Sequence, residues 1–183
     1  MLELIRSARH SLLFQIPYIG MRPDPSVHRG NIDELIDALV EKLKTLEDAR
    51  VLLRMGNDGF SDNRHVSWFF LSRGVPGDRL RQIADHHTKG MVVDGQRVMI
   101  GSHNWSSQGV SVNRDASIIF NEPRLAGYFG EAFEIDWDRA NRVTTKRFVR
   151  EMPELMTGGE EMASAPAGFA LKPLSEILGE ADD

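Results

Sequence analysis

Asp94-Gly95 is the feature of this sequence that most limits how the chain can fold. The dipeptide separates two apolar runs, residues 86–93 and 97–101. Asp-Gly between apolar runs is the strongest short signal for a two-residue hairpin, because both central residues of that turn need positive φ angles. The sequence therefore predicts an antiparallel hairpin with strands at 86–93 and 97–101, and the other elements must assemble around it.

Apolar spacing predicts those other elements. Strands are expected at 11–17, 50–55, 80–84 and 114–120, and helices at 2–10, 32–46, 66–72 and 125–139. Strands that first alternate with helices and then follow one another indicate an α/β (α+β layered) domain, a mixed β-sheet flanked by helices. This domain is expected to occupy residues 1–149. Residues 150–183 change to Pro, Gly, Ala, Glu and Met, which predicts a flexible or partner-dependent C-terminal tail.

Two helices carry clear apolar faces. Asn31 is a good N-cap, and Glu34 three residues later completes a capping box. The helix that follows has apolar residues at helical spacing, namely Ile32, Leu35, Ile36, Leu39, Val40, Leu43 and Leu46. The apolar set predicted for the last helix is Leu125, Tyr128, Phe129, Ala132, Phe133, Ile135 and Trp137.

Composition excludes several classes of function. The 183 residues include no cysteine, so disulfides, cysteine nucleophiles and thiolate zinc sites are excluded. A formal net charge of -5 argues against a protein that coats nucleic acid without specificity. No apolar run approaches the ~20 residues needed to span a bilayer. If Met1 is the native start, the absence of a signal-peptide layout predicts a cytoplasmic protein.

Polar residues with phosphate chemistry cluster between residues 87 and 115. His87 and Lys89 are one residue apart, so on a strand they point to the same face. A neutral imidazole beside an ammonium suits reaction at a phosphate ester, since the lysine neutralises phosphate oxygens while the histidine supplies a nucleophile or a proton. This chemistry requires neither a metal nor a cofactor.

Three further positions complete the cluster. Asn104 can donate from its amide to a phosphate oxygen, and Gly101 allows close approach of the backbone. Asp115, at the start of the predicted strand 114–120, is placed to accept the proton on the far nitrogen of His87.

Neighbouring residues have structural interpretations. Asp94 is first of all a turn residue, and Trp105 is expected to pack in the core. His86 and His103 alternate away from the key positions, which predicts that they lie in solvent or behind the site.

The spacing of these residues resembles the His-Lys-Asp motif of the phospholipase D superfamily. The motif begins with HxK at His87, and four residues separate it from Asp94. Six further residues separate Asp94 from GSxN, which ends at Asn104. The acid expected downstream is Asp115, where Glu is usual. The segment 15–18 also resembles the end of the first strand of a family repeat. The resemblance covers roughly residues 1–142, which is a single repeat similar to the C-terminal half of a bacterial two-repeat protein.

This resemblance implies a two-step phosphodiester cleavage through a phosphohistidine, without a metal. His87 is then the nucleophile or the general acid, Lys89 and Asn104 hold phosphate oxygens, and Asp115 orients His87. Ser102 contributes a hydroxyl near the substrate. Asp94 and Gly101 belong to the motif as structural positions.

The resemblance also implies a second motif that faces the first. This sequence contains a single motif. Two explanations fit: the chain is half of a longer two-repeat enzyme, or two copies form a two-fold homodimer with one shared site. An isolated monomer is expected to be inactive in both cases.

The residues leave the substrate open between lipid and nucleic acid. The loops at 18–30 and 56–63 contain few basic residues, so no extended groove for a polynucleotide is visible, and a phospholipid is favoured. The alternatives are a homodimeric nuclease of the same superfamily and a catalytically silent phosphate-binding or dimerisation module. The intact set of motif residues argues against the silent module.

Overall fold

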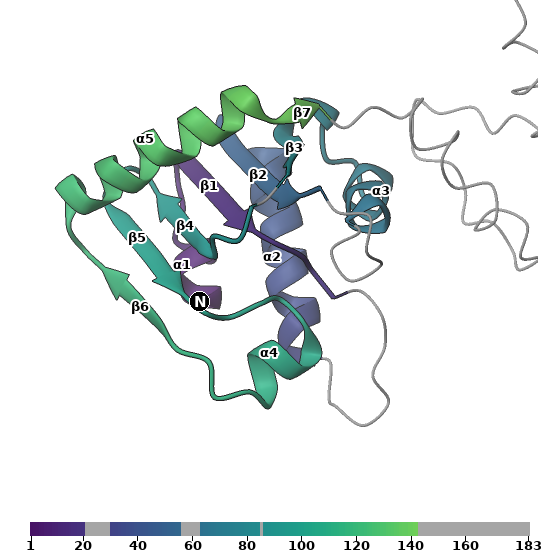
Figure 1. Ribbon diagram of the computed structural model, residues 1–183, viewed down its shortest axis with the longest axis horizontal. Coiled ribbons are helices and arrows are strands. Elements are labelled where there is room, and N and C mark those ends of the chain that lie inside the picture. The colour runs from purple at the N-terminus through teal and green to yellow at the C-terminus, as the bar shows by residue number, and fades with distance from the viewer. Residues whose placement is uncertain (21–29, 56–62, 85, 143–183) are drawn as a thin grey trace, which may run out of the picture.

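A computed structural model describes residues 1–20, 30–55, 63–84 and 86–142. These residues form three layers, with a mixed seven-stranded sheet between helices on both faces (Figure 1). The predicted α/β class, a mixed sheet flanked by helices, is confirmed. The predicted tail 150–183 lies outside the described residues, as do most of the loops 18–30 and 56–63.

The sheet combines a parallel half with an antiparallel half. In spatial order its strands are β6 (Ser117–Phe120), β5 (Arg97–Gly101), β4 (Gly90–Val93), β1 (Ser11–Ile16), β2 (Asp48–Arg54), β3 (Leu80–Ile83) and β7 (Asn141–Arg142). β1, β2 and β3 are parallel, whereas β4, β5 and β6 form an antiparallel meander that joins the sheet through β1. The short strand β7, which the sequence did not predict, pairs with β3.

The helices divide between the two faces of the sheet. They are α1 (Leu2–Arg6), α2 (Gly30–Thr45), α3 (Arg64–Ser72), α4 (Ser107–Ser111) and α5 (Pro123–Arg139). α1, α2 and α3 pack on one face with Phe14 and Met91, and α5 covers the other with Leu13 and Val92. Alternate residues of β1 and of β4 therefore enter different cores, as the period of a strand requires.

The amphipathic prediction holds for α2 and fails in part for α5. All seven apolar residues predicted for the face of α2 are buried. α2 begins at Gly30, however, so Asn31 lies inside the helix instead of capping it. In α5 the fully buried residues are Ala126, Phe133 and Trp137, while Tyr128 and Ile135 are exposed. A narrow stripe of apolar residues is enough to pack α5, because only one side of this helix contacts the sheet and the rest of its surface meets water.

The hairpin turn is tied to the beginning of β1. Asp94 and Gly95 have φ angles of 54° and 63°, so both central residues adopt the predicted positive φ. The Asp94 carboxylate accepts hydrogen bonds from the backbone N–H groups of Arg9, His10 and Ser11 at 2.8–3.2 Å. Burial alone raises the pKa of Asp94, but these donors outweigh it and hold the pKa below its usual value. These contacts support the structural role expected for Asp94, which stays a prediction.

Asp94→Asn is expected to lower the free energy of unfolding by about 2 kcal/mol at pH 7, because charge-assisted hydrogen bonds become neutral ones. Asparagine tolerates positive φ, so the turn itself is kept. The folded-state pKa of Asp94 is depressed, so its contribution is present above about pH 4 and is lost as the pH falls through the folded value. Urea unfolding at pH 7 and pH 3 measures this, with Asp78→Asn, an exposed carboxylate, as the control. An equal loss at both pH values would contradict the explanation.

Candidate active site

The predicted site residues meet at one end of the antiparallel meander. His87 and Lys89 precede β4, Asn104 follows β5, and Asp115 precedes β6. Because the three strands are antiparallel in turn, the start of β4, the end of β5 and the start of β6 lie at the same edge of the sheet (Figure 1). The backbone closes this end, since the Gly101 N–H donates to the carbonyl of Lys89 at 3.2 Å. The predicted convergence at one end of a sheet is confirmed.

The prediction that His87 and Lys89 lie on a strand is wrong. β4 begins at Gly90, and residues 86–89 have no regular secondary structure. The last β1 partner of β4 is Gln15, opposite Gly90, and Pro17 lies just beyond the end of β1. Proline has no N–H to donate to a ladder, which explains why the pairing stops there. The two side chains are therefore presented by an irregular segment.

His87 and Lys89 nevertheless contact each other. The Lys89 Nζ lies 3.3 Å from His87 Nδ1 and 3.4 Å from His87 Nε2, and it donates to the His87 carbonyl at 3.0 Å. An ammonium has no lone pair, so its hydrogen bond to the ring requires the unprotonated nitrogen of a neutral imidazole. The His87 side chain is exposed, which leaves it accessible to a substrate.

Lys89 and Asp115 interact electrostatically across the site. Partial burial lowers the pKa of Lys89, and the carboxylate of Asp115 acts in the opposite direction. The two groups therefore lie close enough to influence each other, although Lys89 precedes β4 and Asp115 precedes β6.

Asp115 contacts Ser102 and not His87. It lies two residues before β6 instead of starting that strand. The Ser102 Oγ donates to Asp115 Oδ1 at 2.8 Å, and the Ala116 N–H donates to the same Oγ at 3.1 Å. Within the part of the chain that the structure describes, no hydrogen bond joins His87 to Asp115, so the predicted contact is not seen. The cause is the pairing of Ser102 N–H with the Ala116 carbonyl at 2.9 Å, which places the short serine side chain beside residue 115.

Asn104 is held by a packed turn. The next residue, Trp105, is 1% exposed and packs on Phe14 with ring centroids 4.5 Å apart, as expected for a core residue. A Cβ at Gly109 would lie 2.3 Å from the Asn104 carbonyl oxygen, so the chain can pass there only as glycine. The Asn104 Oδ1 is buried and has no hydrogen-bond partner among the described residues. Its amide thus has unused hydrogen-bonding capacity at the end of β5.

Comparison with known proteins identifies the family. A family model described as "Cardiolipin synthase, PLD-like domain" matches residues 1–137. The chain belongs to this phospholipase D-like family. The matched residues include strands β1 to β6, helices α1 to α4 and most of α5.

Similar proteins agree with this assignment. The chain is 26% identical over 124 residues to a mitochondrial cardiolipin hydrolase from Chlamydomonas reinhardtii, covering 60% of this chain and 54% of that protein. It therefore spans about half the length of this curated relative.

Among solved structures, Nuc from Salmonella typhimurium, a phospholipase D family member, has a TM-score of 0.61 at 21% identity over 79% of this chain and 88% of that one. NucT from Helicobacter pylori has a TM-score of 0.53 at 13% identity, covering 78% and 87%. A phosphatidylserine synthase from Haemophilus influenzae has a TM-score of 0.54 at 15% identity, covering 80% and 38%. At these identities the likeness shows a shared fold.

Gly101 fits the phospholipase D-like motif as a structural position. A Cβ there would lie 2.1 Å from Ser117 Oγ and 2.5 Å from the Ala116 carbonyl oxygen, so β5 and β6 can close only over glycine. Beside it, His103 Nδ1 lies 2.7 Å from Ser117 Oγ, with the side chain half-buried. His103 thus lies behind the motif residues, one of the two positions expected for it.

His86 is the residue of this phospholipase D-like site that sequence reasoning underestimated. It is 5% exposed, which excludes the expected position in solvent, and its Nε2 has no hydrogen-bond partner among the described residues. Burial lowers the pKa of His86 from 6.5 to about 4, against the opposing effect of Asp136 on α5. His86 is therefore neutral near pH 7. No sequence signal distinguishes it from His87, because burial at residue 86 depends on tertiary packing.

Two further features are absent from the described residues. No group of three or more His, Cys, Asp or Glu side chains among them could hold a metal ion. No helix in the same part of the chain is long and apolar enough to cross a membrane.

Proposed function

We propose that this chain is a metal-independent phosphodiesterase of the phospholipase D type that acts on a phosphatidyl group. The observation that carries the proposal is the exposed imidazole of His87 in contact with the Lys89 ammonium, at the sheet end where Ser102, Asn104 and Asp115 also lie. A nucleophile or acid beside a phosphate-neutralising cation is the arrangement that phosphoryl transfer needs.

The proposed reaction has two steps. In the first, a histidine nitrogen forms a bond to phosphorus and the bond to the leaving alkoxide breaks, while a second histidine gives its proton to that oxygen. In the second, water attacks the phosphohistidine, the histidine that lost its proton takes one from the water, and the phosphomonoester leaves. His87 serves as nucleophile or as general acid, and its counterpart in the second motif takes the other role.

The remaining residues stabilise the charge that develops on the phosphate. Lys89 neutralises non-bridging oxygens, and we assign to the side-chain NH2 group of Asn104 the role of a neutral donor. Ser102 is already a donor to Asp115, so we assign it a shared role in which its hydroxyl reorients toward the substrate. Asp115 acts mainly through the charge of Lys89.

The second motif comes from outside this chain. The single motif, together with a span of 54% of the cardiolipin hydrolase relative, supports either half of a longer enzyme or a two-fold homodimer. We propose that neither a lone monomer nor a lone half turns over substrate.

A phospholipid is the favoured substrate. The family description names cardiolipin synthase and the curated relative is named a cardiolipin hydrolase, both of which handle phosphatidyl groups. The cytoplasmic location expected from the sequence stays a prediction, since that relative is named a mitochondrial protein.

Incubation with a chelator tests the proposal directly. Cardiolipin vesicles, phosphatidylcholine vesicles and single-stranded DNA are offered separately in EDTA, and products are followed by mass spectrometry. Phosphatidic acid from a lipid, with an acid-labile phosphatidyl group trapped on the nucleophilic histidine by rapid quenching, is the expected result. Cleavage of DNA alone identifies the nuclease instead. No turnover of any of the three by a protein shown to be dimeric identifies the silent module.

Asp115→Asn is expected to lower kcat/KM by about tenfold and to shift the alkaline limb of the pH–rate profile to lower pH. The amide still accepts the hydrogen bond from Ser102, but the charge that favours the ammonium of Lys89 is gone, so Lys89 loses its proton at lower pH. A pH–rate profile from pH 5 to 10 measures this. Ser102→Ala, which keeps the carboxylate, is the control and should leave the alkaline limb in place. An unchanged limb in Asp115→Asn removes this role from Asp115.

A further inference from the structure

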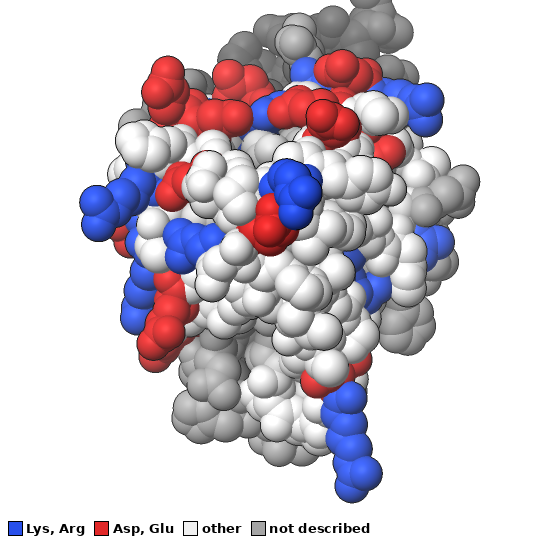
Figure 2. Space-filling view, turned by 90° about the vertical axis from the view of Figure 1, so that its left-hand side faces the viewer, with Lys and Arg blue, Asp and Glu red and all other residues white. Residues whose placement is uncertain are grey.

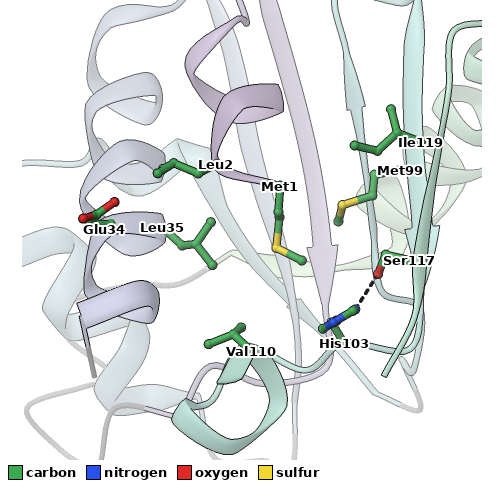
Figure 3. Close-up of a pocket in the computed structure, with 9 residues that line it drawn as sticks. All are labelled: Met1, Leu2, Glu34, Leu35, Met99, His103, Val110, Ser117 and Ile119. Atoms are coloured by element: carbon green, nitrogen blue, oxygen red, sulfur yellow. Dashed lines mark hydrogen bonds between the residues drawn. The ribbon is translucent and has the colours of Figure 1, made fainter. Parts of the chain in front are cut away.

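A second feature of the fold lies beside the candidate site, on the face of the sheet covered by α1 and α2. It is a pocket of about 380 Å3 between α1, α2 and α4 on one side and β5 and β6 on the other (Figure 3). Its lining is mainly apolar, from Met1, Leu2, Leu35, Met99, Val110 and Ile119, with Glu34, His103 and Ser117 as the polar members. A cavity of this size, apolar with a few polar groups, is typical of a ligand site.

The polar end of the pocket is continuous with the motif residues. His103 and Ser117, joined by the hydrogen bond drawn in Figure 3, are the neighbours in sequence of Ser102 and Ala116. Ser102 and Ala116 are paired across the strands at 2.9 Å, and Ser102 binds Asp115. The polar end of the pocket therefore lies at the same end of the meander as the motif residues.

The chemistry of the lining selects the occupant. Among the described residues the lining contains no Lys or Arg side chain, and its one carboxylate, Glu34, repels a polyanion. A polynucleotide is therefore a poor fit, because binding it requires cations along its path. An aliphatic chain fits, since each methylene removed from water onto apolar side chains contributes favourably.

The surface around the pocket also favours an aliphatic chain over a charged ligand. Ile119 lines the pocket from the edge strand β6 and is 44% exposed, so the pocket reaches the sheet edge. Figure 2 shows uncharged surface over much of the middle of this side, with acidic side chains along the top, where α5 lies, and Lys and Arg side chains toward the left and lower margins. An uncharged approach favours an apolar chain over a charged one.

We propose that this pocket receives one aliphatic chain of the phosphodiester substrate while the phosphate lies near Lys89. The inference rests on the proposed function for the identity of the phosphate site, and it adds that substrate selection depends on the length of an acyl chain. Neighbouring residues of β6 provide a matched test, because Ile119 lines the pocket while Ile118 is 59% exposed and does not line it.

The experiment measures binding without turnover. Calorimetry compares decyl phosphate, kept below its micelle concentration, with ethyl phosphate on the whole chain. We expect decyl phosphate to bind at least about tenfold tighter, which about two buried methylenes suffice to produce. Ile119→Trp fills the pocket and should bring the ratio of the two affinities close to one, while Ile118→Trp keeps it. Val110→Phe, from α4, is a second filling variant in case the first is poorly folded.

Several outcomes overturn the inference. Equal affinities of the unmodified protein for decyl and ethyl phosphate would show that the aliphatic chain does not bind in this pocket. An affinity ratio that is unchanged in both filling variants would show the same. A self-association that Ile119→Trp abolishes, measured by sedimentation with the affinity ratio intact, assigns the pocket to a second copy. Failure of the proposed function looks different, because decyl and ethyl phosphate then still bind while the vesicle assay shows no turnover by a protein shown to be dimeric.

Discussion

Replacing His87 by Asn removes turnover, by at least about 10^3-fold in kcat, while the protein stays folded. The exposed imidazole is the described group best placed to bond to phosphorus or to protonate the leaving oxygen, and an amide can do neither. Asparagine is close in size, and His87 packs against no core cluster, so the melting temperature should remain within a few degrees. Initial rates on the best substrate, with circular dichroism for the fold, provide the measurement.

Replacing His86 instead serves as the matched control. His86→Gln keeps a neutral polar side chain in the buried position next to the candidate nucleophile. A buried side chain cannot take over the role of the exposed imidazole of His87. It should reduce the melting temperature more than the rate. Residual activity of more than a few per cent in His87→Asn would contradict the role of His87 as nucleophile or general acid.

His87→Asn subunits also test whether a dimer shares one site between its two chains. In a homodimer with one shared site, a heterodimer of wild-type and His87→Asn subunits lacks one of its two histidines. After equal mixing and subunit exchange, about a quarter of the sites then remain intact, against about half if each chain acts alone. An activity near one half, in a protein that sedimentation shows to be dimeric, contradicts a shared site.

Replacing Lys89 by Met is expected to lower kcat/KM by about 10^2-fold, comparable to the loss of one preorganised donor to a developing charge. The ammonium lies within 3.4 Å of both ring nitrogens of His87, so its loss also frees the ring to rotate. Methionine covers the same surface with its stem, which isolates the charge from the packing.

Lys89→Arg tests whether charge alone is enough. Arginine keeps the positive charge but presents it as a planar fork, so we expect partial recovery, to within about tenfold of the unmodified protein. Binding of inorganic phosphate by calorimetry gives a readout that does not depend on turnover. If Lys89→Met binds phosphate as well as the unmodified protein does, Lys89 does not contact the substrate phosphate.

The sequence predicted most reliably the features with local causes. The hairpin turn followed from the positive φ that Asp94 and Gly95 can adopt, and the burial of α2 from its spacing of apolar residues. The gathering of His87, Asn104 and Asp115 at one end of the sheet followed from strand order within a short antiparallel meander.

The failed predictions depended on residues distant in the chain. β4 starts at Gly90 because Pro17, more than seventy residues earlier, stands where its ladder would continue. The burial of His86 and the contact of Asp115 with Ser102 both depend on tertiary structure. The second arises because β5 and β6 pair in one particular register. Ile135 satisfies helical spacing but faces water because the sheet reaches only part of α5. Local periodicity contains none of this information.

The arrangement of the sheet has a consequence for how the protein acquires its site. The strands that surround the site, β4 to β6, lie within 31 residues of sequence and can pair with one another early. Their attachment to the rest of the sheet is through β1, from the first sixteen residues, and closing so long a loop is slow. During synthesis β1 leaves the ribosome long before its partner β4 does, and one flank of it stays unpaired in the meantime. Chaperone dependence during expression should therefore be relieved by changes that shield β1, and not by changes at the catalytic residues.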